Sequence, residues 1–231
     1  MIYSSVGFGG GSSYLALLAL AGVGFYELKP TALFCNIVVV TGGVFVFYRN
    51  GKLDLKKGLS FIVPSIPLAF LGGYFRLQQH SGFITLAITL MVASIFLWFQ
   101  PKKEVIPKES GNIWLNGGIG MAIGFISGLV GIGGGIFLSP ILHLMDWGEA
   151  KKISALASFF ILVNSISGLL GQWTQSVSMD YSFILPLLGA VFIGGQIGSR
   201  LGAKVFNPLY IKRITAIVVL IAGLIILKEH I

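Results

Sequence analysis

Two glycine runs are the residues of this sequence best suited to hold a ligand. Gly7 to Gly11 and Gly131 to Gly135 share the pattern Gly-X-Gly-Gly-Gly and lie 124 positions apart. Without Cβ atoms, the backbone can take positive φ angles and present successive N–H groups to a neighbour. A helix that starts there also points its partly positive N-terminus at the same place. We predict that an anion binds at both runs, at Gly9, Gly10, Gly11, Gly133, Gly134 and Gly135.

The alternative use of such glycines is close packing between helices through small residues. In a membrane, an irregular turn of this kind is tolerated where it is buried in protein or lines a watery cavity. Both interpretations stay open at this point.

Polar side chains inside apolar segments form the second group of candidates. Asn36 and Ser158 match at an offset of 122, and Asn164 and Ser165 follow Ser158 in the same segment. A buried amide or hydroxyl needs a partner, either a neighbouring helix or a substrate oxygen. We predict that Asn36, Ser158 and Asn164 contact the substrate. His143 lies in an apolar segment and could relay protons, with a structural role as the alternative.

The sequence contains little that indicates catalysis. None of the eight carboxylates lies deep in an apolar segment, and no Ser-His-Asp or phosphate-loop pattern stands out. The single cysteine, Cys35, lies in an apolar run, and the three histidines do not have a metal-ligand spacing. We therefore predict that the protein is no enzyme and has no metal site and no cofactor.

The composition is that of an integral membrane protein. Of the 231 residues, 55% are hydrophobic and 10% are charged, whereas ordinary globular domains carry about 25% charged residues. The net charge of +8 comes from Lys and Arg scattered between apolar segments, without a basic patch that would indicate nucleic acid. We predict a multi-pass protein of the bacterial inner membrane, whose partners are lipid and a small anion; a homo-oligomer is left open.

Apolar segments of about 20 residues are long enough to span a bilayer. Nine apolar segments can be recognised, at residues 12–24, 31–48, 59–75, 82–99, 113–130, 134–145, 153–171, 181–197 and 214–227. Segments 12–24 and 134–145 are short, and each directly follows a glycine run. We expect them to be half-helices in an all-α polytopic fold of about eight or nine transmembrane or half-membrane helices.

Lys and Arg predict the orientation, because they are retained on the cytoplasmic side. If segments 113–130 and 134–145 make two passes, thirteen of these residues lie on one side, and Lys29, Arg76 and Lys228 lie on the other. A single broken helix would divide them eight against eight. The first arrangement fits the rule, so the chain should reverse direction at Gly131.

An internal repeat divides the chain. Pairs that match at an offset of 122 are Glu27 and Glu149, Lys29 and Lys151, Pro64 and Pro186, and Gly72-Gly73 and Gly194-Gly195. An odd number of passes separates matched segments, so the copies should be inverted, which is a transporter architecture. We assign residues 1–100 to the first repeat, 101–112 to a cytoplasmic linker and 113–231 to the second repeat. The Glu and Lys pairs are expected to end helices and anchor loops, with gating as the alternative.

The run GLVGIGGGIFLSP at residues 128–140, followed by Glu149-Ala-Lys151, the 186–198 stretch and Lys212-Arg213, resembles the TauE/SafE family of sulfite and organosulfonate exporters. The resemblance implies an exporter of small sulfur-containing oxyanions, with the anion held between the two glycine breaks. The family has an apolar helix before its first glycine run, whereas six residues stand there in this sequence, and Ala16 replaces a counterpart of Pro140. A passive anion channel and a non-transporting membrane scaffold or assembly factor are the alternative functions.

Overall fold

The computed structural model describes residues 10–98, 112–174, 181–205 and 208–231. Within these ranges the chain is all-helical and contains no strand, as predicted. Its elements are α1 (Gly11–Leu20), α2 (Phe25–Arg49), α3 (Leu55–Tyr74), α4 (Gln79–Trp98), α5 (Ile113–Val130), α6 (Gly135–Leu144), α7 (Ala150–Trp173), α8 (Tyr181–Val205) and α9 (Pro208–Glu229). Five of these helices, α2, α3, α4, α5 and α7, are long and apolar enough to cross a membrane.

Glycines lie at the starts of both short helices and at the end of the first. Helices α1 and α6 each have ten residues, and they start after Gly10 and Gly134, whose φ angles are 118° and 83°. Helix α5 ends at Val130, directly before Gly131, which has a φ of 88°. Helix α1 ends at Leu20, four residues before the predicted end, because Gly22 takes a φ of 79° and turns the chain.

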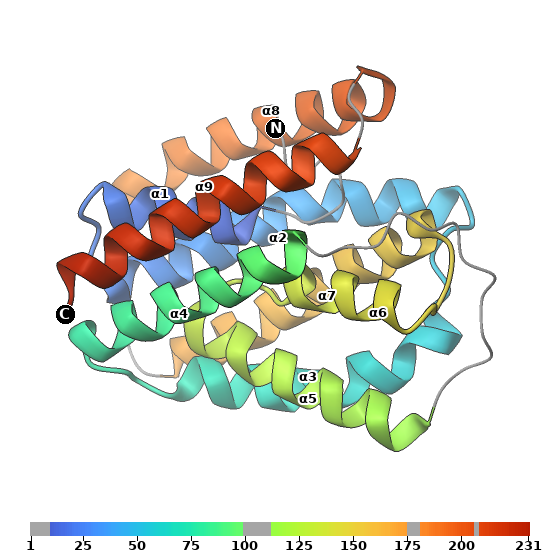
Figure 1. The fold of residues 1–231 in the computed structure, drawn as a ribbon, viewed down its shortest axis with the longest axis horizontal. Helices are drawn as coiled ribbons and strands as arrows, with labels where there is room; N and C mark the ends of the chain where they lie inside the picture. Colours follow the sequence, from blue (N-terminus) through green and yellow to red (C-terminus); the bar gives the residue numbers. More distant parts are fainter. Residues whose placement is uncertain (1–9, 99–111, 175–180, 206–207) are drawn as a thin grey trace.

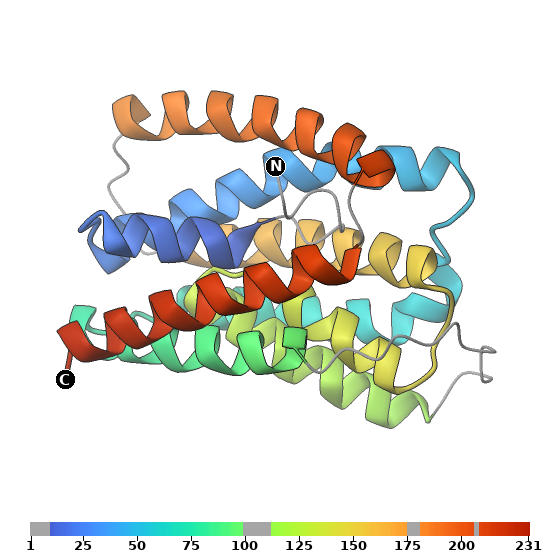
Figure 2. The same ribbon diagram turned by 45° about the horizontal axis from the view of Figure 1, so that its top comes forward.

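The long helices lie roughly along the longest axis of the molecule, with α2 and α7 packed against each other (Figure 1). Helix α3 packs on α5 and α7, α8 packs on α2, and α4 packs on α9. The turned view shows α8 along one edge, beside α2 (Figure 2). Glycines bring α3 and α5 very close, since Cβ atoms at Gly120, Gly124 and Gly128 would collide with the α3 backbone.

Helices that the repeat matches run in opposite directions in Figure 1: α1 against α6, α2 against α7, α3 against α8, and α4 against α9. Their contacts also correspond, because α3 packs on α7 as α8 packs on α2, and α1 packs on α9 as α6 packs on α4. An inverted repeat requires both features. The inversion itself, and the division at residues 101–112, stay predictions; residues 99–111 lie outside the described ranges.

Basic residues gather at one end of the bundle, where α2 ends and α3 and α7 begin. They are Arg49, Lys52, Lys56, Lys57, Lys151 and Lys152. Lys52 lies 3.8 Å from Glu149, which joins the α2–α3 connection to the start of α7. Lys29 and Arg76 lie at the opposite end, where α2 begins and α3 ends. This separation of charge is the one on which the predicted orientation rests.

The orientation can be tested at the two ends of α3. In a Cys35→Ala background, we expect Gln78→Cys to react with a membrane-impermeant maleimide added to intact cells. Lys56→Cys should react only after the membrane is permeabilised, because the positive-inside rule places that end in the cytoplasm. Labelling of Lys56→Cys but not Gln78→Cys in intact cells would reverse the assignment.

Candidate anion site

Gly11, the last glycine of the first run, lies against the second glycine turn, and Asn36 lies beside both. A Cβ atom at Gly11 would collide with the carbonyl oxygen of Ile132 and come within 2.7 Å of Asn36 Nδ2. Asn36 is fully buried, and its Nδ2 donates a hydrogen bond to the Ile132 carbonyl oxygen at 3.1 Å. The structure therefore brings Asn36 of α2 together with a glycine turn 96 residues later in the chain.

The backbone of the second turn offers several hydrogen-bond donors. Gly131, Gly133 and Gly134 have φ angles of 88°, 86° and 83°, which glycine adopts without steric cost. In the described part of the chain, no acceptor is paired with the backbone N–H groups from Ile132 to Ile136. Buried backbone N–H groups normally have a partner, so a run of unpaired donors at a helix N-terminus suits an anion.

Ser165 of α7 lies with Asn36 beside Gly133, and these two side chains and the backbone N–H groups of the turn form the cluster at Gly133. From α7, only Asn164 and Ser158 were predicted to contact the substrate. A Cβ atom at Gly133 would lie 2.9 Å from Asn36 Nδ2 and 3.1 Å from Ser165 Oγ. Ser165 Oγ and Asn36 Oδ1 are buried, and neither has a hydrogen-bond partner among the described residues. The cluster thus contains unsatisfied polar groups, which a bound ligand or water would satisfy.

The other predicted side chains have bonds within their own helices. Ser158 Oγ donates to the Ser154 carbonyl at 2.9 Å, and Asn164 Nδ2 donates to the Phe160 carbonyl at 2.9 Å. His143 is buried in the last turn of α6, at the opposite end of that helix from the glycine turn. Their predicted substrate and proton roles stay predictions, as does that of Gly9, which lies outside the described residues.

Gly10, Gly134 and Gly135 have a different environment from Gly133. A Cβ atom at Gly134 would lie 2.8 Å from Phe160 and 2.9 Å from Ile123, and one at Gly135 would press on Ile161. At Gly10, the Tyr14 ring lies in the way, at 2.7 Å. The Cβ positions of these glycines therefore face packed side chains, whereas that of Gly133 also faces the polar atoms of Asn36 and Ser165. The packing alternative fits these three glycines, and ligand binding at the glycine runs stays a prediction.

A sequence comparison identifies the family. The family model described as "Sulfite exporter TauE/SafE" matches residues 1–226. The chain belongs to the TauE/SafE family. In the described part of the chain, no three His, Cys, Asp or Glu side chains gather in a way that could hold a metal ion.

Curated relatives of this chain have similar lengths. The "Probable membrane transporter protein y4hK" of Sinorhizobium fredii is 30% identical over 231 residues, which cover 97% of this chain and 92% of the relative. The "Probable membrane transporter protein YunE" of Bacillus subtilis is 25% identical and covers 94% and 90% of the two chains. No solved structure matches the chain. Together with the apolar helices, the match makes this chain a multi-pass membrane protein of a transporter family.

The tight packing of the second turn predicts a stability difference between two glycine substitutions. Gly22 and Gly134 have similar positive φ angles, but a Cβ atom at Gly22 would meet nothing within 4 Å. Gly22→Ala should therefore cost only the backbone strain, about 1 kcal/mol. Gly134→Ala should cost about 1–3 kcal/mol more, because its methyl group would press on Phe160 and Ile123.

Thermal unfolding of the two variants in detergent measures this difference. The midpoint of Gly134→Ala should be clearly lower than that of Gly22→Ala. Equal midpoints would contradict the tight packing of the turn.

Proposed function

We propose that this protein exports small sulfur-containing oxyanions, of the sulfite or organosulfonate type. The family description supports the substrate class. The cluster around Gly133 supports the binding mode, because the unpaired N–H groups of the turn, Asn36 Nδ2 and Ser165 Oγ lie together. This convergence of donors at a helix N-terminus is the observation that carries the proposal.

An oxyanion suits this cluster for a chemical reason. It presents several acceptor oxygens, whereas the turn offers backbone donors without a charged side chain. Neutral donors bind an anion and release it again more readily than a buried cation would, and a carrier needs both steps. No bond of the substrate is made or broken in this scheme, so no enzymatic step is proposed.

Alternating access would come from rocking of the two predicted inverted repeats about the contact between α2 and α7. Discontinuous helices that meet near the midplane are the binding elements of transporters with inverted repeats. Helices α1 and α6 are short, begin at glycine turns and run in opposite directions. These features support a carrier over the passive channel, and the scaffold alternative predicts no flux at all.

Transport by the purified protein in liposomes tests the function. Sulfite, thiosulfate, sulfoacetate and sulfate are supplied separately, and uptake is compared with that of protein-free liposomes. We expect saturable uptake of at least one of these anions, together with counterflow. Flux without saturation or counterflow would favour the channel, and absence of flux for all four would contradict the proposed function.

Two serines of α7 separate substrate binding from stability. Ser165 Oγ has no hydrogen-bond partner, whereas Ser167 Oγ donates to the Ile66 carbonyl at 2.6 Å and joins α7 to α3. Ser165→Ala should cut flux about tenfold and leave the thermal midpoint unchanged or slightly higher, because no bond between helices is lost. Ser167→Ala should lower the free energy of unfolding by about 1 kcal/mol and keep the flux of the folded protein.

Both variants are measured by flux per folded molecule and by thermal midpoint. Unchanged flux in Ser165→Ala would remove this hydroxyl from the substrate site.

A further inference from the structure

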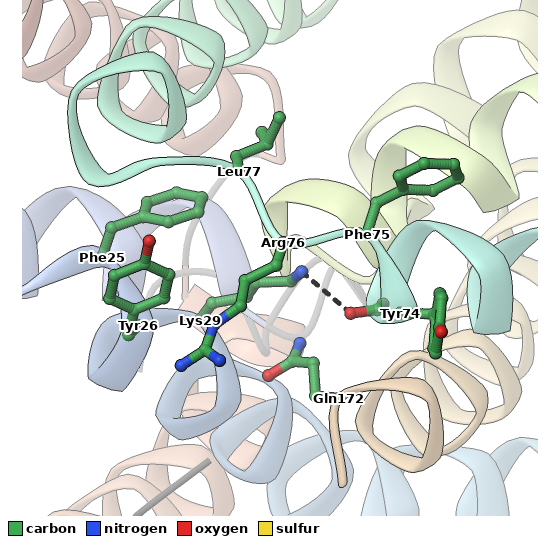
Figure 3. A pocket seen from close by; sticks show the side chains of 9 residues that line it. Phe25, Tyr26, Lys29, Tyr74, Phe75, Arg76, Leu77 and Gln172 are labelled. Atoms are coloured by element: carbon green, nitrogen blue, oxygen red, sulfur yellow. Dashed lines mark hydrogen bonds between the residues drawn. The ribbon is translucent and has the colours of Figure 1, made fainter. Parts of the chain in front are cut away.

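A second cluster of polar side chains lies at one end of the bundle, opposite the end where most of the Lys and Arg residues gather. It forms a small pocket where α2 begins, α3 connects to α4 and α7 ends (Figure 3). Two of its side chains, Lys29 and Arg76, are cations, Gln172 carries an amide donor, and Tyr26 and Tyr74 carry hydroxyl donors. The rest of the lining is largely aromatic and includes Phe25, Tyr26, Tyr74 and Phe75.

Lys29 is a buried cation without an anionic partner in this pocket. Its side chain is 6% exposed, and its Nζ donates to the carbonyl oxygens of Gly72 and Gly73 at 3.4 and 3.3 Å. These are long bonds, and an ammonium group has three donors. No carboxylate lines the pocket. A buried charge is costly unless it is paired, so the site lacks a negative group.

Gln172 and Arg76 add further donors to the same space. Gln172 is 3% exposed, lines the pocket, and its Nε2 has no hydrogen-bond acceptor among the described residues. Arg76 lies at the exposed side, with its guanidinium carbon 5.1 Å from the centre of the Tyr26 ring. Figure 3 shows the Gln172 amide beside the Lys29 and Arg76 side chains, with Lys29 Nζ directed toward the carbonyl end of α3 and the Arg76 guanidinium directed the other way, toward Tyr26. The pocket thus has two positive charges and an unpaired amide donor.

We propose that Lys29, Arg76 and Gln172 form a second oxyanion-binding site, at the outer end of the pathway to the glycine turns. The inference rests on the proposed function for the class of its ligand. An oxyanion supplies what the pocket lacks, namely negative charge and several acceptor oxygens. The free volume is about 20 Å³, which is the room that one water needs, so the exposed Arg76 side chain must swing outward to admit the anion.

The fold connects this pocket with the cluster at Gly133. Lys29 and Asn36 are seven residues apart on α2, and Ser165 and Gln172 are seven apart on α7. Seven residues are about two helical turns, or about 10 Å, and place both members of a pair on one face. Gly131 lies between the pocket and the cluster at Gly133, and its Cβ position is 3.0 Å from the Lys29 side chain. An anion released from the outer site would therefore travel a distance of about two helical turns, about 10 Å, to reach the glycine turn.

Binding of radiolabelled sulfite, thiosulfate and sulfate to the detergent-solubilised protein tests this site. Lys29→Gln should weaken binding at the outer site about tenfold or more, and leave the site at the glycine turn unchanged, because it removes the buried charge. Lys151→Gln is the matched control. Lys151 occupies the equivalent position of the repeat, but it is exposed at the opposite end of the bundle, so its loss should leave the affinity unchanged.

Gln172→Glu provides an independent test that does not depend on removing Lys29. The new carboxylate would supply the missing negative charge to Lys29, so we expect it to abolish binding at the outer site, leaving one bound anion per protein instead of two, while the thermal midpoint stays equal or rises. Both measurements come from the same preparation of folded protein.

Wild-type affinity in Lys29→Gln would overturn the inference and leave water as the occupant of the pocket. Two anions bound per protein in Gln172→Glu, as in the wild type, or no binding of any of the three anions by the wild type, would overturn it as well. The liposome experiment then decides the proposed function separately, because flux through the glycine turns does not require the outer site to be occupied at equilibrium.

Discussion

The hydrogen bond from Asn36 Nδ2 to the Ile132 carbonyl is the contact on which the centre of this structure depends. It joins α2, in the first half of the chain, to the glycine turn of the second half, at 3.1 Å and fully buried. The lack of a Cβ at Gly11 and Gly133 makes the contact possible, because side chains there would occupy the same space. The same amide that fixes the turn therefore also lies beside the backbone donors that could hold an anion.

The helices were predictable because their signals are local. Apolar length and glycine positions indicated both half-helices, and α1 and α6 begin within one residue of the predicted starts. The converging side chains were less predictable, because neighbours on a helix point about 100° apart. Ser165, and not the predicted Asn164, therefore reaches the cluster. Lys29 was expected to end a helix and anchor a loop, since the apolar segment 31–48 starts after it, but α2 begins at Phe25 and includes Lys29.

The pocket at Lys29 and the cluster at Gly133 differ in charge, and the membrane explains this difference. A charged side chain is more costly deep in a bilayer than near its surface, where water and headgroups are close. Lys29 and Arg76 accordingly lie at the end of the bundle, whereas the inner cluster consists of an amide, a hydroxyl and backbone N–H groups. In this arrangement, the charges at the end of the bundle would attract an anion first, and the neutral donors of the inner cluster would then hold it.

The most direct test of the central claim is to locate the bound anion. Crystals grown with the selenium analogue of the oxyanion that the liposomes take up would give an anomalous difference map. We predict a selenium peak within hydrogen-bonding distance of Asn36 Nδ2, Ser165 Oγ and the backbone N–H groups of residues 132–136. A protein that transports this anion but shows no peak at the glycine turn, with the peak elsewhere between the helices, would contradict the account.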